Sequence, residues 1–310
     1  MNEAQLVARV RELFSARIGD DAAVIGEQVF TTDMLVEDVD FTRETPLRFV
    51  ARKSLAVNLS DIAAMGAVPA YALLALALPP WAHDRVDELL VAFAEAAKEH
   101  HIEIVGGDVS RGEKLTIAIT AVGRIETRAL LRSGAKRGDR IYLSRPIGAS
   151  AAGLALLQSN VAASYAEREF AESCIRRHLD PEPELALGAA LARIPQVTAC
   201  IDVSDGLSTD LHHLCDASNV GAEIERERIP IFPDLQTYGP KLGIRVRDAV
   251  LDGGEEYALL FTSSLAGFDL SRLTGRPVYA IGRITAERGV IIKEDGVARP
   301  LPAGGFDHFS

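Results

Sequence analysis

Helical and strand-like patterns of apolar residues alternate along most of the chain. Apolar residues at helical spacing predict helices over residues 3–14, Pro46–Met65 and His83–His101. Short runs of branched and apolar residues predict strands over Val29–Val36, Ala70–Leu78, Ile102–Val105 and Leu115–Ile125. Gly66 ends the second helix, whose residues are apolar on most sides and therefore predict a buried helix. This alternation is typical of an α/β protein.

A polar, glycine-containing stretch at Arg132–Arg140 separates two such halves. We place the domain boundary there, with residues 1–136 as an N-terminal domain and 137–310 as a C-terminal domain. In the second half the pattern predicts strands over Ile141–Leu143, Ala199–Val203 and Glu255–Thr262, and helices over Ala149–Gln158, Ala166–His178 and Leu207–Ala217.

Composition and charge narrow the possible partners. The 310 residues are 48% hydrophobic and 25% charged, which is typical of a globular protein. The net charge of −11 repels a phosphate backbone, so we expect no nucleic-acid partner. The most apolar stretch, Ala67–Pro80, is shorter than the roughly 20 residues of a membrane-spanning helix. Three cysteines without a C-x-x-C pair fit a reducing cytoplasm.

Acidic residues recur beside glycine and at the ends of apolar runs. They are Asp20, Asp21, Asp33, Asp108, Asp202, Asp205, Glu255 and Glu256. Any one of them alone is explained as a turn residue or a helix cap, and Asp205 is expected to cap the helix that follows it. In an extended segment Asp202 and Ser204 point to the same face. Because several of these acids lie inside apolar segments, the set as a whole indicates a ligand site.

Asp61 is the clearest case, because it lies within a helix predicted to be buried. A buried carboxylate is costly unless it is paired or binds a metal. Asn58 lies three residues earlier and shares its helix face. Oxygen ligands of this kind suit Mg²⁺, and an ion pair with Lys53 or Arg52 is the ordinary alternative.

The common nucleotide-binding motifs are absent from the sequence. It has no G-x-x-x-x-G-K-[ST] loop, no G-x-G-x-x-G and no kinase H-R-D or D-F-G set. If the chain uses ATP, it does so by a less common route, such as several Mg²⁺ ions gathered by carboxylates.

Eight stretches, in order and over nearly the whole chain, resemble the thiamine-monophosphate kinases. They are Ile18–Val24, Thr31–Asp33, Ala56–Gly66, Gly106–Asp108, Arg132–Lys136, Ile201–Leu207, Gly253–Glu255 and Phe306–Phe309. This family shares its fold with aminoimidazole ribonucleotide synthetase. The resemblance implies a two-domain α/β (α+β) protein, whose N-terminal mixed sheet forms a barrel with that of a second subunit in a homodimer, and whose C-terminal domain is α/β.

The resemblance also implies roles for individual residues. The implied Mg²⁺ ligands are Asp21, Thr31, Asp33, Asp61, Asp108, Asp202 and Asp205, with Thr32 adjacent. The implied ATP contacts are Gly107, Asp108, Arg132 and Ser204. Glu255 and Phe306 would contact the thiamine side. Asp40 stands where the family usually has a histidine that contacts substrate, so we include it among the substrate residues.

The reaction implied is ATP-dependent phosphorylation of thiamine monophosphate to thiamine diphosphate by direct in-line transfer with several Mg²⁺ ions. The acceptor phosphate is largely ionised near pH 7, so no strong general base is needed. We assign Asp205 and Arg132 to catalysis, through positioning and charge stabilisation. Two alternatives stay open: a catalytically silent sensor of ATP and thiamine phosphates, and another ATP-using enzyme of the same fold. Selenophosphate synthetase needs an N-terminal cysteine, whereas the first cysteine here is Cys174.

Overall fold

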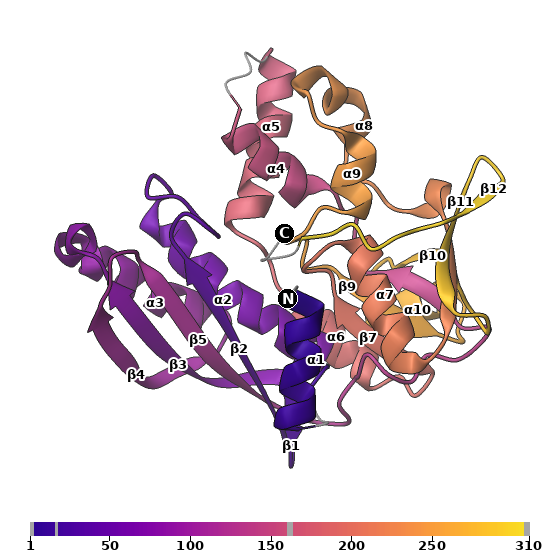
Figure 1. The fold of residues 1–310 in the computed structure, drawn as a ribbon, viewed down its shortest axis with the longest axis horizontal. Coiled ribbons are helices and arrows are strands. Elements are labelled where there is room, and N and C mark those ends of the chain that lie inside the picture. Colours follow the sequence, from indigo (N-terminus) through magenta and orange to yellow (C-terminus); the bar gives the residue numbers. More distant parts are fainter. Residues whose placement is uncertain (1–2, 16–17, 160–163, 307–310) are drawn as a thin grey trace.

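The chain folds around two mixed β-sheets, which are described by a computed structural model of residues 3–15, 18–159 and 164–306 (Figure 1). The N-terminal sheet has five strands in the order β1-β2-β5-β3-β4, all paired antiparallel except β3 with β4. Its strands are β1 (Ala23–Ile25), β2 (Gln28–Val36), β3 (Val68–Leu78), β4 (Glu103–Arg111) and β5 (Thr116–Arg124). The sheet is preceded by helix α1 (Glu3–Leu13).

One face of this sheet is covered by helices. Helix α2 (Leu47–Ala64) packs on β2 and β5, and α3 (Val86–Glu99) follows a 3-10 helix over Pro80–Arg85 and packs on α2. The strand residues that face α2, including Ile117 and Ile119, are fully buried. They form the N-terminal core together with Leu55 and Leu59 of α2.

The opposite face of the N-terminal sheet, which we call the outer face, is covered by none of the described helices. Side chains alternate between the two faces of a strand, and the outer face carries Phe30, Thr32 and Met34 of β2 and Tyr71 and Leu73 of β3. Met34, Tyr71 and Leu73 are 60%, 46% and 47% exposed. The outer face is therefore an apolar surface open to solvent in the single chain.

The C-terminal sheet has seven strands in the order β12-β11-β8-β10-β6-β9-β7, of which only β11 and β8 are parallel neighbours. Its strands are β6 (Arg140–Leu143), β7 (Val197–Asp202), β8 (Gly221–Glu225), β9 (Leu259–Ser263), β10 (Tyr279–Thr285), β11 (Gly289–Glu294) and β12 (Val297–Pro300). Its helices are α4 (Ala149–Leu157), α5 (Tyr165–Leu179), α6 (Leu185–Ala192), α7 (Leu207–Ser218), α8 (Leu235–Tyr238), α9 (Val246–Leu251) and α10 (Gly267–Thr274). Among the described helices, none is both long and apolar enough to cross a membrane.

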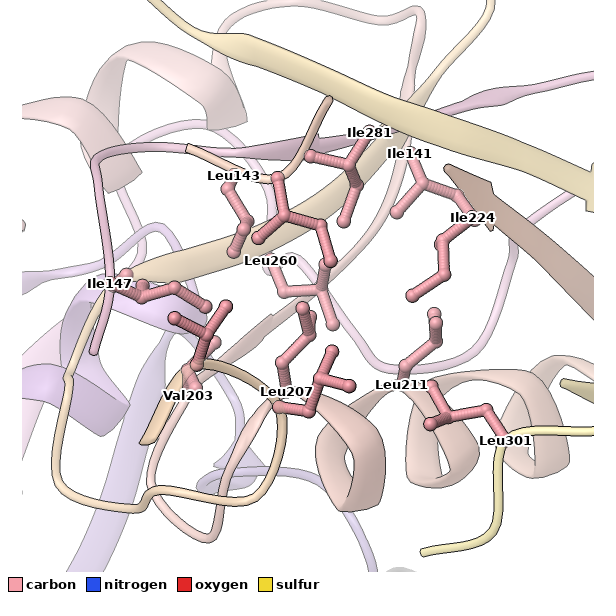
Figure 2. Close-up of a cluster of buried hydrophobic side chains, with 14 of the residues drawn as sticks. Ile141, Leu143, Ile147, Val203, Leu207, Leu211, Ile224, Leu260, Ile281 and Leu301 are labelled. Atoms are coloured by element: carbon pink, nitrogen blue, oxygen red, sulfur yellow. The ribbon is translucent and has the colours of Figure 1, made fainter. Parts of the chain in front are cut away.

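The largest apolar core lies between one face of this sheet and helix α7. Figure 2 shows Leu207 and Leu211 of α7 beside Val203, with Leu260 and Ile281 of the sheet across from them. All five side chains are completely buried. This core fixes the segment between β7 and α7, where Asp202, Ser204 and Asp205 are located.

The two halves meet where α2 packs against α6. Ala63 of α2 is buried in one cluster with Leu187 and Leu191 of α6. At the contact, a Cβ on Gly188 would lie only 2.0 Å from the carbonyl oxygen of Ala63. Only glycine allows the two backbones to approach this closely.

The elements predicted from the sequence are present, with differences at two places that matter for the site. The strand predicted over Glu255–Thr262 begins only at Leu259, because Glu255 and Tyr257 adopt left-handed backbone angles that break a strand. The strand predicted over Ile102–Val105 continues to Arg111, so Asp108 lies inside a strand instead of after one. The short strands β8, β10, β11 and β12 were not predicted.

We expect Leu260→Ala to lower the free energy of unfolding by about 2–5 kcal/mol, because it leaves a cavity in the close-packed core. Urea denaturation measures the change. Leu157→Ala makes the same chemical change at a side chain that is 46% exposed, and it should cost less than about 1 kcal/mol. Equal losses in the two variants would contradict this description of the core.

Candidate functional site

Three carboxylates from distant parts of the chain converge between the two sheets. Asp21 precedes β1, Asp61 lies on α2, and Asp202 ends β7. One carboxylate oxygen from each lies within 4.8 Å of the others. We call these three residues the carboxylate cluster. The sequence analysis predicted all three as metal ligands, and the fold brings them together.

The carboxylate cluster has fewer partners than its charge demands. Arg132 donates from Nη2 to Oδ1 of Asp21 at 2.7 Å, and Ser60 donates from Oγ to Oδ2 of Asp202 at 2.5 Å. The hydroxyl of Thr31 donates to Asp61. The second oxygen of Asp21 is buried and accepts no hydrogen bond from any of the described residues. An orphaned oxygen of this kind calls for an explanation, such as a bound cation.

Burial and mutual repulsion raise the pKa values of the carboxylates in and beside the cluster. Burial, followed by the charge of Asp21, raises the pKa of Asp202 to about 8. Burial, then the charges of Asp33 and Asp202, raises the pKa of Asp61 well above its ordinary value. Burial, then the charge of Asp40, raises the pKa of Asp33 to about 6. Like charges this close cannot all ionise without a counter-ion.

The cluster adjoins a cavity of about 650 Å³, which we call the main cavity and which is lined by both halves of the chain. Eight residues predicted for the site line it: Asp33, Asp40, Asp61, Asp202, Ser204, Asp205, Glu255 and Phe306. A volume of this size is within the range of small-molecule sites.

The segment between β7 and α7 differs from prediction in how its helix begins. Asp205 does not cap α7; the residue at the cap position is Gly206, with φ of 122°. Asp210, one turn into the helix, accepts hydrogen bonds instead from the backbone amides of Asp205 (3.2 Å) and Gly206 (3.0 Å). The carboxylate of Asp205 is left on the surface of the main cavity, 4.0 Å from His213.

The C-terminal tail is tied to the start of α7. The backbone amide of Phe306 donates to the carbonyl of Asp205 at 3.1 Å, and that of Gly305 donates to Oγ1 of Thr209 at 3.0 Å. A Cβ on Gly305 would lie 2.2 Å from the Asp205 carbonyl oxygen. Phe306 is thereby placed at the cavity with a half-exposed ring. The rest of the closing motif, residues 307–310, lies outside the described residues.

Thr32, Gly107 and Asp108 lie apart from the carboxylate cluster. Asp108 is exposed on edge strand β4, where it pairs in register with Ala75 on the outer face, opposite α2. Thr32 also lies on the outer face, and its hydroxyl donates to the carbonyl of Ile119 at 3.1 Å. Gly107 has a structural requirement of its own, because a Cβ there would overlap the Leu74 carbonyl oxygen at 1.7 Å.

The ordinary alternative for Asp61, an ion pair with Lys53 or Arg52, is wrong. Lys53 lies 2.6 Å from Oε1 of Glu255, and Arg52 pairs with Glu99 and Asp180. These contacts also reveal Lys53 as a site residue that the sequence analysis left out. A lysine within an apolar helical stretch was the signal that could have identified it.

Asp40 occupies a turn at the edge of the main cavity. Its Oδ2 accepts a hydrogen bond of 2.7 Å from the backbone amide of Val36, at the end of β2. Asp33 and Asp40 both line the main cavity, and the charge of Asp40 contributes to the raised pKa of Asp33.

Comparisons with known proteins agree over nearly the whole chain. Residues 19–125 match the AIR synthase related protein, N-terminal domain, and residues 136–294 match the AIR synthase related protein, C-terminal domain. The thiamine-monophosphate kinase of Bacillus subtilis (strain 168) is 36% identical, covering 94% of this chain and 93% of that protein. The thiamine-monophosphate kinase of Escherichia coli (strain K12) is 37% identical, covering 94% and 91%.

A solved structure of AaThiL complexed with AMPPCP and TMP superimposes on this chain with a TM-score of 0.89. It is 32% identical in sequence, and the match covers 99% of this chain and 97% of that one. The likeness therefore includes both sheets and the main cavity between them.

Without divalent cations, the free energy of unfolding should fall as the pH rises from about 4 to about 8. An aspartate whose pKa is higher in the folded than in the unfolded protein stabilises the fold at low pH, fully so below its ordinary value of 3.8. That contribution is lost as the pH passes the folded pKa, about 6 for Asp33 and about 8 for Asp202. Urea denaturation with EDTA measures the trend.

Added Mg²⁺ should remove this decline, because a bound cation favours the ionised carboxylates. Asp202→Asn, which cannot ionise, should flatten the upper part of the EDTA curve. A stability that stays level or increases over this pH range in EDTA would contradict the raised pKa values.

Proposed function

Because this chain belongs to the thiamine-monophosphate kinases, within the AIR synthase related proteins, we propose that its main cavity transfers the γ-phosphate of ATP to thiamine monophosphate. The products are thiamine diphosphate and ADP. The observation that carries the proposal is the convergence of Asp21, Asp61 and Asp202 beside a cavity of about 650 Å³.

This transfer requires neutralisation of the negative charges on the two phosphate groups more than it requires a general base. The acceptor phosphate has a second pKa near 6 and is mostly ionised at about pH 7. ATP brings roughly four negative charges and the acceptor about two, so the reacting groups repel each other. The enzyme's task is to hold both in line while their charge is neutralised.

The carboxylate cluster fits divalent cations. It offers hard oxygen ligands, an unpartnered buried oxygen on Asp21, and raised pKa values that a bound cation would reverse. We propose that Asp21, Asp61 and Asp202 bind Mg²⁺, with Thr31, Asp33 and Asp205 as the nearby predicted ligands. When bound, Mg²⁺ neutralises the phosphates and orients them for transfer.

The organic part of the acceptor would bind among Phe306, Glu255 and Asp40, which line the main cavity. The ring of Phe306 can stack on the pyrimidine or face the thiazolium cation, a contact that contributes about 0.5–2 kcal/mol. Glu255 and Asp40 supply carboxylates to the same cavity. A cationic ring among acidic side chains is electrostatically favourable.

Arg132, Ser204, Gly107 and Asp108 are proposed to contact ATP. Arg132 is poised by its double contact with Asp21, from Nη2 at 2.7 Å and Nε at 3.2 Å, and an arginine of this kind stabilises charge on phosphates. Ser204 lines the main cavity. Gly107 and Asp108 lie on edge strand β4 and would act where a second subunit completes the N-terminal sheet.

A homodimer is proposed because the outer face is apolar and exposed. Two N-terminal sheets that pair along their edges with their outer faces turned toward each other would form a closed barrel and bury Tyr71, Leu73 and Met34. The division into domains 1–136 and 137–310 is supported by the sheets, which end at Arg124 and begin at Arg140. Three free, buried cysteines support a reducing cytoplasm as the site of action.

We expect the purified protein to convert thiamine monophosphate to thiamine diphosphate in the presence of ATP and Mg²⁺, with one ADP formed per turnover. Chromatography of the thiamine phosphates measures the products, and EDTA should abolish them. Binding of ATP without diphosphate formation would contradict the proposal and favour the sensor.

Asp205→Asn removes a charge at the main cavity while keeping the shape of the side chain. Turnover at saturating Mg²⁺ should fall by roughly 100-fold or more, because positioned charge contributes most of the rate in phosphoryl transfer. Asp234→Asn makes the same change at an exposed residue that does not line the main cavity and should leave turnover unchanged. Near-normal turnover of Asp205→Asn would remove Asp205 from the catalytic residues.

We also expect Leu73→Asp to produce monomers, because it puts a charge at the centre of the outer face. Light scattering coupled to size exclusion measures the mass. Leu157→Asp changes a side chain of nearly equal exposure, 46% against 47%, on helix α4, and should leave the dimer intact. A wild-type protein that is monomeric at micromolar concentration would overturn the barrel.

A further inference from the structure

Lys53 is a buried cation next to the main cavity. It projects from α2 and is 3% exposed. Its Nζ lies 2.6 Å from Oε1 of Glu255 and 3.5 Å from the backbone carbonyl oxygen of Asp40. An ammonium group taken out of water is costly unless a charged partner compensates it. Glu255 is that partner, so the two side chains depend on each other.

The other oxygen of Glu255 faces a histidine. Nδ1 of His178 lies 3.2 Å from Oε2 of Glu255 and 3.0 Å from Oγ of Ser150. Burial, and then the charge of Lys53, lowers the pKa of His178 to about 3, so the ring is neutral near pH 7. Glu255 is therefore held between one cation and one neutral ring, and the group as a whole carries no net charge.

The backbone at Glu255 is held in an unfavourable conformation that aims this side chain. Glu255 has φ of 58° and Tyr257 has φ of 49°, in the left-handed region that side chains other than glycine disfavour. Their amides donate to the carbonyls of Ser204 (2.7 Å) and Val203 (2.8 Å), directly after β7. The carboxylate of Glu255 consequently stays at the cavity surface, where its side chain is 30% exposed.

We propose that Lys53 is a positioning residue for substrate binding, which fixes the ionised carboxylate of Glu255 so that it accepts a hydrogen bond from the organic part of the acceptor. This inference rests on the proposed function. Lys53 and Glu255 neutralise each other, so Glu255 attracts a free cation only weakly. Its main role is then that of a directional hydrogen-bond acceptor for an N–H donor, such as the amino group of an aminopyrimidine. Nδ1 of His178 contacts the second oxygen of Glu255 and limits the positions that this oxygen can take.

The contacts of Lys53 explain why it would affect one substrate and not the other. They join α2 to the Asp40 turn and to the loop before β9, and both of these loops line the main cavity, as Phe306 does. The predicted ATP contact Arg132 is tied instead to Asp21. Loss of Lys53 should weaken the acceptor and spare the nucleotide.

The test is a kinetic comparison of Lys53→Met, Lys53→Arg and Glu255→Gln with the wild-type protein. Lys53→Met should raise the KM for thiamine monophosphate roughly 10- to 100-fold, the loss typical of a hydrogen bond to a charged group, and change the KM for ATP less than about 2-fold. Lys53→Arg keeps the charge and should recover part of the loss. The double variant Lys53→Met with Glu255→Gln should be no worse than either single one, because both remove the same interaction.

Arg52→Met provides a matched control on the same helix. Arg52 is the neighbour of Lys53, has equally close ion pairs with Glu99 (2.8 Å) and Asp180 (2.6 Å), and does not line the main cavity. This variant should lower Tm and leave both KM values unchanged. If Lys53→Met behaves like Arg52→Met, or raises the two KM values equally, Lys53 is only structural and the inference is overturned.

The same variants separate this inference from the proposed function. If the wild-type protein forms no thiamine diphosphate, the proposed function fails, and calorimetry then measures the binding of thiamine monophosphate alone. Binding by wild type that is roughly 10-fold or more weaker in Lys53→Met supports the positioning role. Equal binding by the two proteins, or binding by neither, overturns it.

Discussion

The arrangement of this protein depends on the repulsion among carboxylates that the fold forces together. Asp21, Asp61 and Asp202 come from three separate segments, and each is held by packing that serves the fold as a whole. Buried like charges oppose folding unless protons or cations neutralise them. The core around α7 and the helix α2 supply the stability that allows this arrangement to persist. The site is thus a destabilising element that the rest of the molecule supports.

Much of the site could be predicted from residue type and local context. A carboxylate inside an apolar helix, as at Asp61, is conspicuous because burial of charge is costly, and the acids beside glycine were recognisable for the same reason. The periodic pattern also predicted the long helices and the central strands, since these bury one continuous face. Eight of the predicted residues line one cavity, and the roles of Asp40, Ser204 and Phe306 among them came from the family resemblance and not from residue type alone.

What the sequence could not supply was geometry that depends on contacts between distant segments. The strands β8, β10, β11 and β12 are only four to seven residues long, and only β12 lies at an edge of the sheet, so their sequence patterns are weak. Asp108 looked like a residue at a strand end, but β4 continues past it because β3 provides a parallel partner. Lys53 was considered only as an alternative partner for Asp61, whereas a loop from the C-terminal half of the chain brings Glu255 to it. Such pairings are decided by tertiary packing.

The contact between Gly188 and Ala63 has a consequence for how the protein receives its ligands. The backbones of α2 and α6 are in direct contact here. A rotation of the N-terminal half relative to the C-terminal half would therefore break close-packed surface between these helices. The distance between Asp61 on α2 and Asp202 on β7 is therefore set before any ligand arrives. Any adjustment to a substrate would then take place within the loops that line the main cavity, and not between the two halves. The carboxylate cluster is therefore a preformed site, which does not depend on a closing motion of the two halves to bring its members together.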